Sequence, residues 1–229
     1  MRGALLASLL LTAPAASACD IALMLAVDVS GSVDGREYRI QMDGLAAALT
    51  DRSVMGALVA SQAQIALMQW TGTGRQTVVI NWTKITNTDD VHAFAFEVAT
   101  VPRLWRDFST AIGEALALAV PYFAIVDDCD RFVIDISGDG ISNEGQAPRA
   151  VWPDLEVAGV TVNAMVIQDT GFDLTEWFES HVITGPGAFA VTANSFDEYP
   201  EQIIRKLYRE LTTPISMGPI SSGSTGELP

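Results

Sequence analysis

Basic residues are scarce in this chain of 229 residues. Lys and Arg number 13 against 28 Asp and Glu, which gives a formal net charge of −15 at pH 7. Nucleic-acid binding and attachment to an anionic membrane surface are both disfavoured, because each needs a basic footprint. Hydrophobic residues make up 49% of the chain. This content indicates a folded protein rather than a disordered one, and the length suits one sizeable domain.

Long hydrophobic runs are also scarce, and the run near the N-terminus is too short to span a membrane. It follows Arg2 and precedes Ala16-Ser17-Ala18, an A-x-A cleavage pattern. We therefore expect residues 1–18 to be a signal peptide and the mature protein to be periplasmic or secreted. A lipoprotein modified at Cys19 is a minor alternative, because Ala16 stands where a lipobox normally has Leu.

Cysteine is nearly absent, since the chain contains only Cys19 and Cys129. Each precedes an apolar segment that we predict to be a strand. Two cysteines at the entrances of two strands suggest a disulfide in an exported protein. If the two strands are neighbours in the sheet, their starts lie within bridging distance. We expect Cys19 and Cys129 to form a disulfide.

Apolar segments that suit buried strands alternate with segments of helical spacing along the chain. This order predicts an α/β fold with a doubly wound, mostly parallel sheet. A short Gly72-Thr73-Gly74 turn makes the second and third strands a hairpin, so we expect one antiparallel edge strand. The first strand and the strand after Cys129 should be central in the sheet. We expect one domain over residues 19–212 and a disordered Ser/Gly/Pro-rich tail over 213–229.

The expected elements have the following bounds. The first strand begins at Ile21 and ends near Asp28, and the other strands are 64–71, 76–85, 131–137, 160–167 and 188–192. The expected helices are 33–50, 88–100, 109–126, 147–158, 174–180 and 196–211.

Oxygen-bearing side chains follow the first strand, where Asp28, Ser30 and Ser32 form a D-x-S-x-S pattern. Sites in open α/β sheets form at the carboxyl ends of the strands. One carboxylate with neutral hydroxyl oxygens suits Mg²⁺, which keeps several of its waters. Two later segments add Thr110, at the start of a strong helix, and Asp139, at the end of the strand after Cys129.

Each later segment also has a purely local interpretation. Ser109 or Thr110 is a plausible helix N-cap, and Asp139-Gly140 is a plausible turn. The three motifs nevertheless occur in order, each at a strand end or a helix start. Their combination favours a metal site over three unrelated caps and turns.

The three motifs together resemble the metal-ion-dependent adhesion site (MIDAS) of von Willebrand factor A (vWA) domains. The resemblance covers roughly residues 21–211 and implies the Rossmann-like vWA fold. The Ser137-Gly138-Asp139-Gly140 version is similar to a bacterial exported subgroup of unknown function (DUF1194-like) and departs from the more usual T-D-G. The resemblance implies Mg²⁺, or else Mn²⁺ or Ca²⁺, with an open coordination position for a carboxylate of a partner protein. The implied ligands are Asp28, Ser30, Ser32, Thr110 and Asp139.

Other polar and aromatic residues lie near these motifs in the sequence. The candidate rim of a partner-binding surface consists of Trp105, Arg106, Asn143 and Glu144. Asp135 lies inside a predicted buried strand, where a charge needs a partner. We expect a structural role for Asp135, with Arg131 or a backbone donor as its partner.

The alternative function is a metal-dependent hydrolase of phosphatase type that uses Asp28 as its nucleophile. Ser30 stands where such an enzyme usually has a second aspartate, and no G-x-S-x-G nucleophile motif is present. His92 and His181 lie outside every motif. The sequence therefore favours a binding domain over an enzyme.

Overall fold

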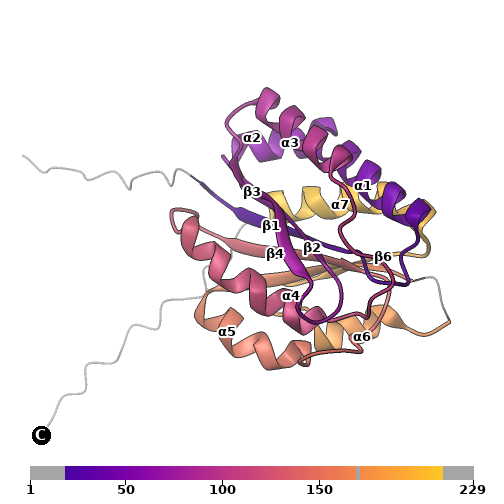
Figure 1. The fold of residues 1–229 in the computed structure, drawn as a ribbon. Helices are drawn as coiled ribbons and strands as arrows, with labels where there is room; N and C mark the ends of the chain where they lie inside the picture. Colours follow the sequence, from indigo (N-terminus) through magenta and orange to yellow (C-terminus); the bar gives the residue numbers. More distant parts are fainter. Residues whose placement is uncertain (1–18, 169–170, 214–229) are drawn as a thin grey trace, which may run out of the picture.

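The computed structural model describes residues 19–168 and 171–213. The expected signal peptide and nearly all of the expected tail lie outside these residues. A six-stranded sheet in the order β3-β2-β1-β4-β5-β6 forms the middle layer (Figure 1). Helices α1, α2, α3 and α7 pack on one face, whereas α4, α5 and α6 pack on the other. The strands are Ala22–Asp28 (β1), Gln64–Trp70 (β2), Gln76–Lys84 (β3), Phe132–Gly138 (β4), Val160–Ile167 (β5) and Ala190–Ala193 (β6).

The helices have these bounds. On the first face they are Gly35–Leu49 (α1), Arg52–Ala60 (α2), Thr88–Thr100 (α3) and Tyr199–Thr212 (α7). On the second face they are Ile112–Ala119 (α4), Trp152–Val157 (α5) and Leu174–His181 (α6). Short 3₁₀ helices are Val120–Ile125 (η1), Pro148–Val151 (η2) and Phe196–Glu198 (η3).

The burial pattern of strand β1 shows why helices cover both faces of the sheet. All of its residues are buried, and successive side chains of a strand point to opposite faces. Leu23 and Leu25 pack with the first layer of helices, whereas Met24 and Ala26 pack with the second. An apolar run buried on both faces is typical of a parallel strand, and β1 pairs in parallel with β2 and β4.

The predicted fold is confirmed, with two differences in the helices. Strands β1 and β4 are central, and β3 is the antiparallel edge strand. The prediction missed α2 altogether. The helix expected over 109–126, with a kink or end at Pro121, is α4 followed from Val120 by the 3₁₀ helix η1. The helices expected over 147–158 and 196–211 likewise begin with the 3₁₀ helices η2 and η3.

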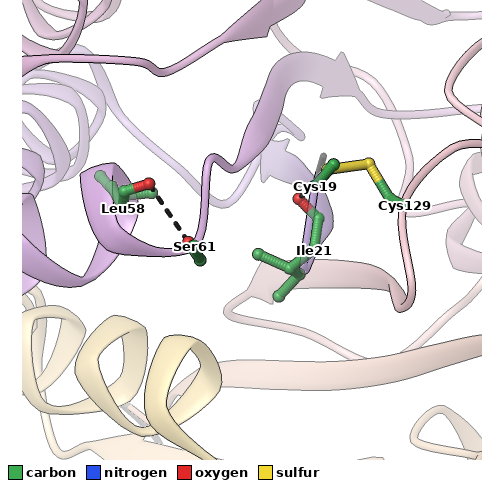
Figure 2. Close-up of a disulfide and its surroundings, with 5 residues drawn as sticks. All are labelled: Cys19, Ile21, Leu58, Ser61 and Cys129. Carbon is green, nitrogen blue, oxygen red and sulfur yellow. Dashed lines mark hydrogen bonds between the residues drawn. A yellow bond between two sulfur atoms is a disulfide. The ribbon is translucent and has the colours of Figure 1, made fainter. Parts of the chain in front are cut away.

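The expected disulfide is confirmed, because the sulfur atoms of Cys19 and Cys129 are bonded (Figure 2). The two residues form a parallel β-bridge just before β1 and β4. A cysteine whose sulfur is in a disulfide is not free for lipid attachment. The bond joins residues 110 positions apart, and closing so long a loop stabilises the fold by about 4–5 kcal/mol in the chain-entropy model.

We expect Cys129→Ser to lower the free energy of unfolding by about 3–5 kcal/mol. Urea denaturation followed by tryptophan fluorescence measures this loss. Wild-type protein kept reduced with dithiothreitol is the matched control and should lose a similar amount. A variant as stable as the oxidised wild type would contradict the expectation.

A buried ion network ties α7 to the sheet, and it corrects the expected partner of Asp135. Lys206 Nζ lies 2.5 Å from Asp135 Oδ1 and 2.7 Å from Glu210 Oε1, and all three side chains are at most 3% exposed. Asn163 donates a further hydrogen bond to Glu210 Oε1. Arg131 instead donates to the backbone carbonyl of Glu210, so the expected Arg131 partner was wrong. Burial, followed by the charge of Asp135, raises the pKa of Glu210 to about 7.

We expect Lys206→Met to lower the free energy of unfolding by about 3–5 kcal/mol, because it leaves two buried carboxyl groups without a cation. The neighbouring Arg205 pairs with Glu201 at the surface, so Arg205→Ala should cost less than about 1 kcal/mol. Urea denaturation of both variants checks this contrast. Equal stability of the two variants would show that the network does not hold α7.

Candidate metal centre

The sheet brings two of the predicted motifs together. Strands β1 and β4 are parallel neighbours, and Val27 pairs with Ser137. Asp28 and the Asp139 turn therefore leave the sheet side by side at its carboxyl edge. The Ser32 hydroxyl donates a hydrogen bond of 2.6 Å to Asp139 Oδ1, and the hydroxyl oxygens of Ser30 and Ser32 lie 3.2 Å apart.

Asp28 is the most enclosed member of this group, with an exposure of 1%. Its Oδ1 accepts a hydrogen bond of 2.7 Å from the Ser30 amide. Its Oδ2 is buried and has no hydrogen-bond partner within the described parts of the chain. Burial, followed by the charge of Asp139, raises the pKa of Asp28 to about 8, against the hydrogen bonds from Ser30. Among the described residues, the charge of Arg103 also lowers the pKa of Asp28, but by too little to offset the burial.

Thr110 lies beside the Asp139 turn and is 5% exposed. A β-carbon placed on Gly140 would lie 3.9 Å from Thr110 Oγ1. Asn143 engages both backbone groups of Thr110. The side-chain oxygen Oδ1 of Asn143 accepts a hydrogen bond of 2.9 Å from the Thr110 backbone amide, and the backbone amide of Asn143 donates one of 2.9 Å to the Thr110 carbonyl. The third predicted motif thus reaches the other two.

The local alternative for Thr110 was wrong, because neither Ser109 nor Thr110 caps the helix. Helix α4 begins at Ile112, and Ala111 occupies the N-cap position without a side-chain hydrogen bond. The hydroxyl of Ser142, from the loop after β4, accepts a hydrogen bond of 3.3 Å from the Ile112 amide. Capping is supplied by a distant loop, so the Thr110 hydroxyl is not used for it.

Two residues that the sequence reasoning missed hold the backbone of the D-x-S-x-S segment. Gln41 of α1 is fully buried, donates to the Asp28 carbonyl at 3.1 Å and accepts from the Ser137 hydroxyl at 2.8 Å. Arg103 donates to the carbonyls of Val29 and Ser30 at 3.0 and 2.8 Å. Gln41 lies 13 residues from Asp28 and Arg103 lies 73 residues from Ser30, and no local pattern marks either of them.

The four candidate rim residues have different positions. Arg106 is exposed, whereas Trp105 is half-buried and packs against the core. Asn143 supports Thr110 as described above. Glu144 accepts a hydrogen bond from the Thr73 amide at 3.1 Å, which joins the loop after β4 to the β2–β3 turn. Asn143 and Glu144 are therefore braces between loops as well as exposed residues.

Close packing explains two glycines of the site. A β-carbon at Gly31 would lie 3.2 Å from the Phe108 carbonyl oxygen, to which the Gly31 amide donates at 2.7 Å. A β-carbon at Gly138 would lie 3.2 Å from the ring of Phe178 and 3.4 Å from Asp28 Oδ2. The departure from T-D-G at position 138 therefore has a steric cause.

The donor set contains two carboxylates and three hydroxyls. In residues 19–168 and 171–213, no cluster of three or more His, Cys, Asp or Glu side chains is arranged to hold a metal ion. That part of the chain therefore contains no metal site built from three or more imidazole, thiolate or carboxylate groups. The oxygen atoms present fit a hard divalent cation that retains water.

Solved structures with the same fold define the class of this protein. Proximal thread matrix protein 1 from the mussel byssus is 20% identical with a TM-score of 0.63, over 83% of this chain and 47% of that chain. A von Willebrand factor type A protein from Catenulispora acidiphila is 15% identical with a TM-score of 0.61, over 84% and 43%. The pilus adhesin SpaC from Lactobacillus rhamnosus GG is 14% identical with a TM-score of 0.60, over 84% and 30%. The fold is that of a vWA domain, and this chain spans less than half the length of each of these proteins.

One structure of the mussel protein is described as having a zinc-occupied MIDAS motif; it is 22% identical with a TM-score of 0.62, over 83% of this chain and 48% of that chain. The chain itself belongs to the family "Protein of unknown function (DUF1194)", whose model matches residues 18–215. The resemblance to vWA domains and to the DUF1194 family is thereby confirmed. No curated protein of similar sequence was found.

We expect Asn143→Ala to expose the Thr110 amide, because it removes the oxygen that accepts its hydrogen bond. Hydrogen exchange of that amide should accelerate by about tenfold or more, equivalent to the roughly 1–2 kcal/mol of one lost hydrogen bond. Asn143→Asp keeps the acceptor and is the matched control, so its exchange should remain near that of the wild type. Unchanged exchange in the alanine variant would remove Asn143 as the support of Thr110.

Proposed function

We propose that this chain is an exported vWA-type binding domain that holds a divalent cation and, through it, a carboxylate of a protein partner. The observation that carries the proposal is Asp28 Oδ2, which is buried beside Asp139 and has no hydrogen-bond partner among the described residues. Burying an ionised oxygen without a partner is costly. A cation at this edge of the sheet would offset that cost.

The residues that would hold the cation supply two charged and three neutral oxygens. They are Asp28, Ser30, Ser32, Thr110 and Asp139. So few charges leave the ion electrophilic, and when bound it would supply a Lewis-acidic position that accepts an external carboxylate. Hard oxygens and retained waters favour Mg²⁺, while Mn²⁺ and Ca²⁺ accept the same donors.

The protein would orient the ligands of the cation through hydrogen bonds of its own. The Ser30 amide orients the carboxylate of Asp28, Gln41 and Arg103 hold the surrounding carbonyls, and Asn143 holds Thr110. Supports of this kind orient metal ligands in proteins and raise their affinity. The ligands are therefore held by contacts that do not depend on the ion.

Three observations support the proposed location and the proposed type of partner. A disulfide persists in oxidising compartments, which suits a periplasmic or secreted protein. Within residues 19–168 and 171–213, no helix has the length and apolar character needed to cross a membrane. The similar folds include a pilus adhesin and a byssus matrix protein. Both names are consistent with a domain whose role is to bind other proteins.

No observation favours the hydrolase. His181 stacks on the Trp177 ring in α6, and His92 lies in α3, so neither belongs to the loops around Asp28. The test below must therefore distinguish the proposed binding domain from a hydrolase that uses Asp28 as its nucleophile.

We expect metal-stripped mature protein to bind Mg²⁺ at one saturable site in calorimetric titration. Asp28→Asn and Asp139→Asn should each weaken binding by about tenfold or more, which is 1.4 kcal/mol or more. Because burial raises the pKa of Asp28 to about 8, Asp28→Asn replaces a largely neutral carboxyl group at pH 7, and the metal-free variant should be about as stable to urea as the wild type. Lost binding without lost stability separates an absent site from an unfolded domain.

The matched control is Glu156→Gln, which neutralises an exposed carboxylate on α5 and should bind Mg²⁺ as the wild type does. Parallel titrations with Mn²⁺ and Ca²⁺ establish the preferred ion. Wild-type protein that binds none of the three ions would overturn the proposal. Turnover of phosphoesters that requires Asp28 would replace it with the hydrolase.

A further inference from the structure

Large apolar side chains are exposed at the loops that build the metal centre. Leu104 and Phe108 are 46% and 37% exposed and lie between α3 and α4. Ile141 is 43% exposed and follows the Asp139 turn. The two loops lie against each other through the hydrogen bonds between Thr110 and Asn143. Exposed apolar groups that adjoin one site point to an interaction surface.

Arginine side chains accompany these apolar groups. The guanidinium carbon of Arg75, from the β2–β3 turn, lies 3.8 Å from the centroid of the Phe108 ring. This stacking fixes the ring at the surface. Arg106, two residues before Phe108, is exposed, and Arg103 donates hydrogen bonds to the D-x-S-x-S backbone. We call Arg75, Leu104, Arg106, Phe108 and Ile141 the rim, a set that shares only Arg106 with the four candidate rim residues named from the sequence.

The charge of this region differs from that of the whole chain. Over the whole chain, acids outnumber bases by 28 to 13. Segments 28–32, 71–75, 101–111 and 139–146 carry Arg75, Arg103 and Arg106 against Asp28, Asp107, Asp139 and Glu144, so acids exceed bases by only one there. Of these acids, Glu144 is engaged with the Thr73 amide and Asp139 accepts from Ser32. With a divalent cation held at the centre, the rim becomes the place on this acidic protein that suits a negative group.

We propose that the rim selects a partner segment in which an acidic side chain is flanked by apolar residues. The inference rests on the proposed function, because the cation receives the carboxylate. Leu104, Phe108 and Ile141 then cover the apolar neighbours of that carboxylate, and Arg75 and Arg106 complement its charge. Such a segment gains both burial and ion contact, whereas an acidic segment with polar flanks gains only the second.

The test uses a peptide array and the full mature protein at saturating Mg²⁺. Each peptide has seven residues with Asp at the centre, and the six flanking positions are all apolar (Leu, Phe, Val), all polar (Ser, Asn), all acidic or all basic. We expect the apolar-flanked set to bind about tenfold more strongly than the polar-flanked set. Replacement of the central Asp by Asn, or addition of a chelator, should abolish the signal.

Matched variants assign the selectivity to the rim. Phe108→Ser and Ile141→Ser should each reduce binding of the apolar-flanked set by about five- to tenfold, which is the effect of losing one apolar anchor. Phe96→Ser removes an equally bulky side chain that is 70% exposed on α3 and should change nothing. Circular dichroism checks the fold, and calorimetry measures the Mg²⁺ affinity of each variant in parallel.

The outcomes separate the two proposals. If the wild type binds none of Mg²⁺, Mn²⁺ and Ca²⁺, the proposed function fails and the rim proposal fails with it. If Mg²⁺ binds but apolar-flanked and polar-flanked peptides give equal signals, or no peptide binds, only the rim proposal fails. The rim proposal also fails, and the proposed function stands, if Mg²⁺ binds and Phe108→Ser behaves like Phe96→Ser.

Discussion

Parallel pairing of β1 with β4 determines where the two candidate carboxylate ligands lie, because neighbouring parallel strands end at the same edge of the sheet. The register sets Val27 opposite Ser137, so the carboxylate of Asp28 and the Asp139 turn emerge together. This arrangement has an electrostatic cost. Asp28 is almost completely buried, its pKa is raised to about 8 by that burial and by the charge of Asp139, and one of its oxygens lacks a hydrogen bond from the described residues. The case for a cation therefore rests on sheet register and burial as well as on the motif.

Cross-loop braces complement this register. Arg103 holds the carbonyls of Val29 and Ser30, Asn143 holds both backbone groups of Thr110, and Glu144 holds the Thr73 amide. Each brace joins segments that are distant in the sequence. A ligand set supported in this way is positioned before it binds anything, and pre-positioned ligands lose less conformational entropy on binding.

The features that could be predicted from the sequence are those set by local preferences. The features that could not be predicted depend on contacts between segments that are remote in the sequence. The D-x-S-x-S motif and strand β1 could be identified from the sequence, because strand and turn preferences are local. Helix α2 also had a local signal, since Asp51 caps it and Val54 and Leu58 recur at helical spacing. Lys206 as the partner of Asp135, and Arg103 as a support of the site, depend on contacts between remote segments. No single-sequence pattern identifies such pairs.

The strongly acidic composition constrains how any acidic partner is recognised. A formal charge of −15 opposes the approach of a negative partner, although salt screens this repulsion beyond about 8 Å at physiological ionic strength. Electrostatic steering therefore contributes little to association, and selectivity must come from contacts made at short range. The cation would supply one such contact for the carboxylate. In the proposed complex Leu104, Phe108 and Ile141 would supply the others, because apolar burial is insensitive to net charge. A domain this acidic is thus able to prefer an acidic residue, provided that the residue's neighbours are apolar.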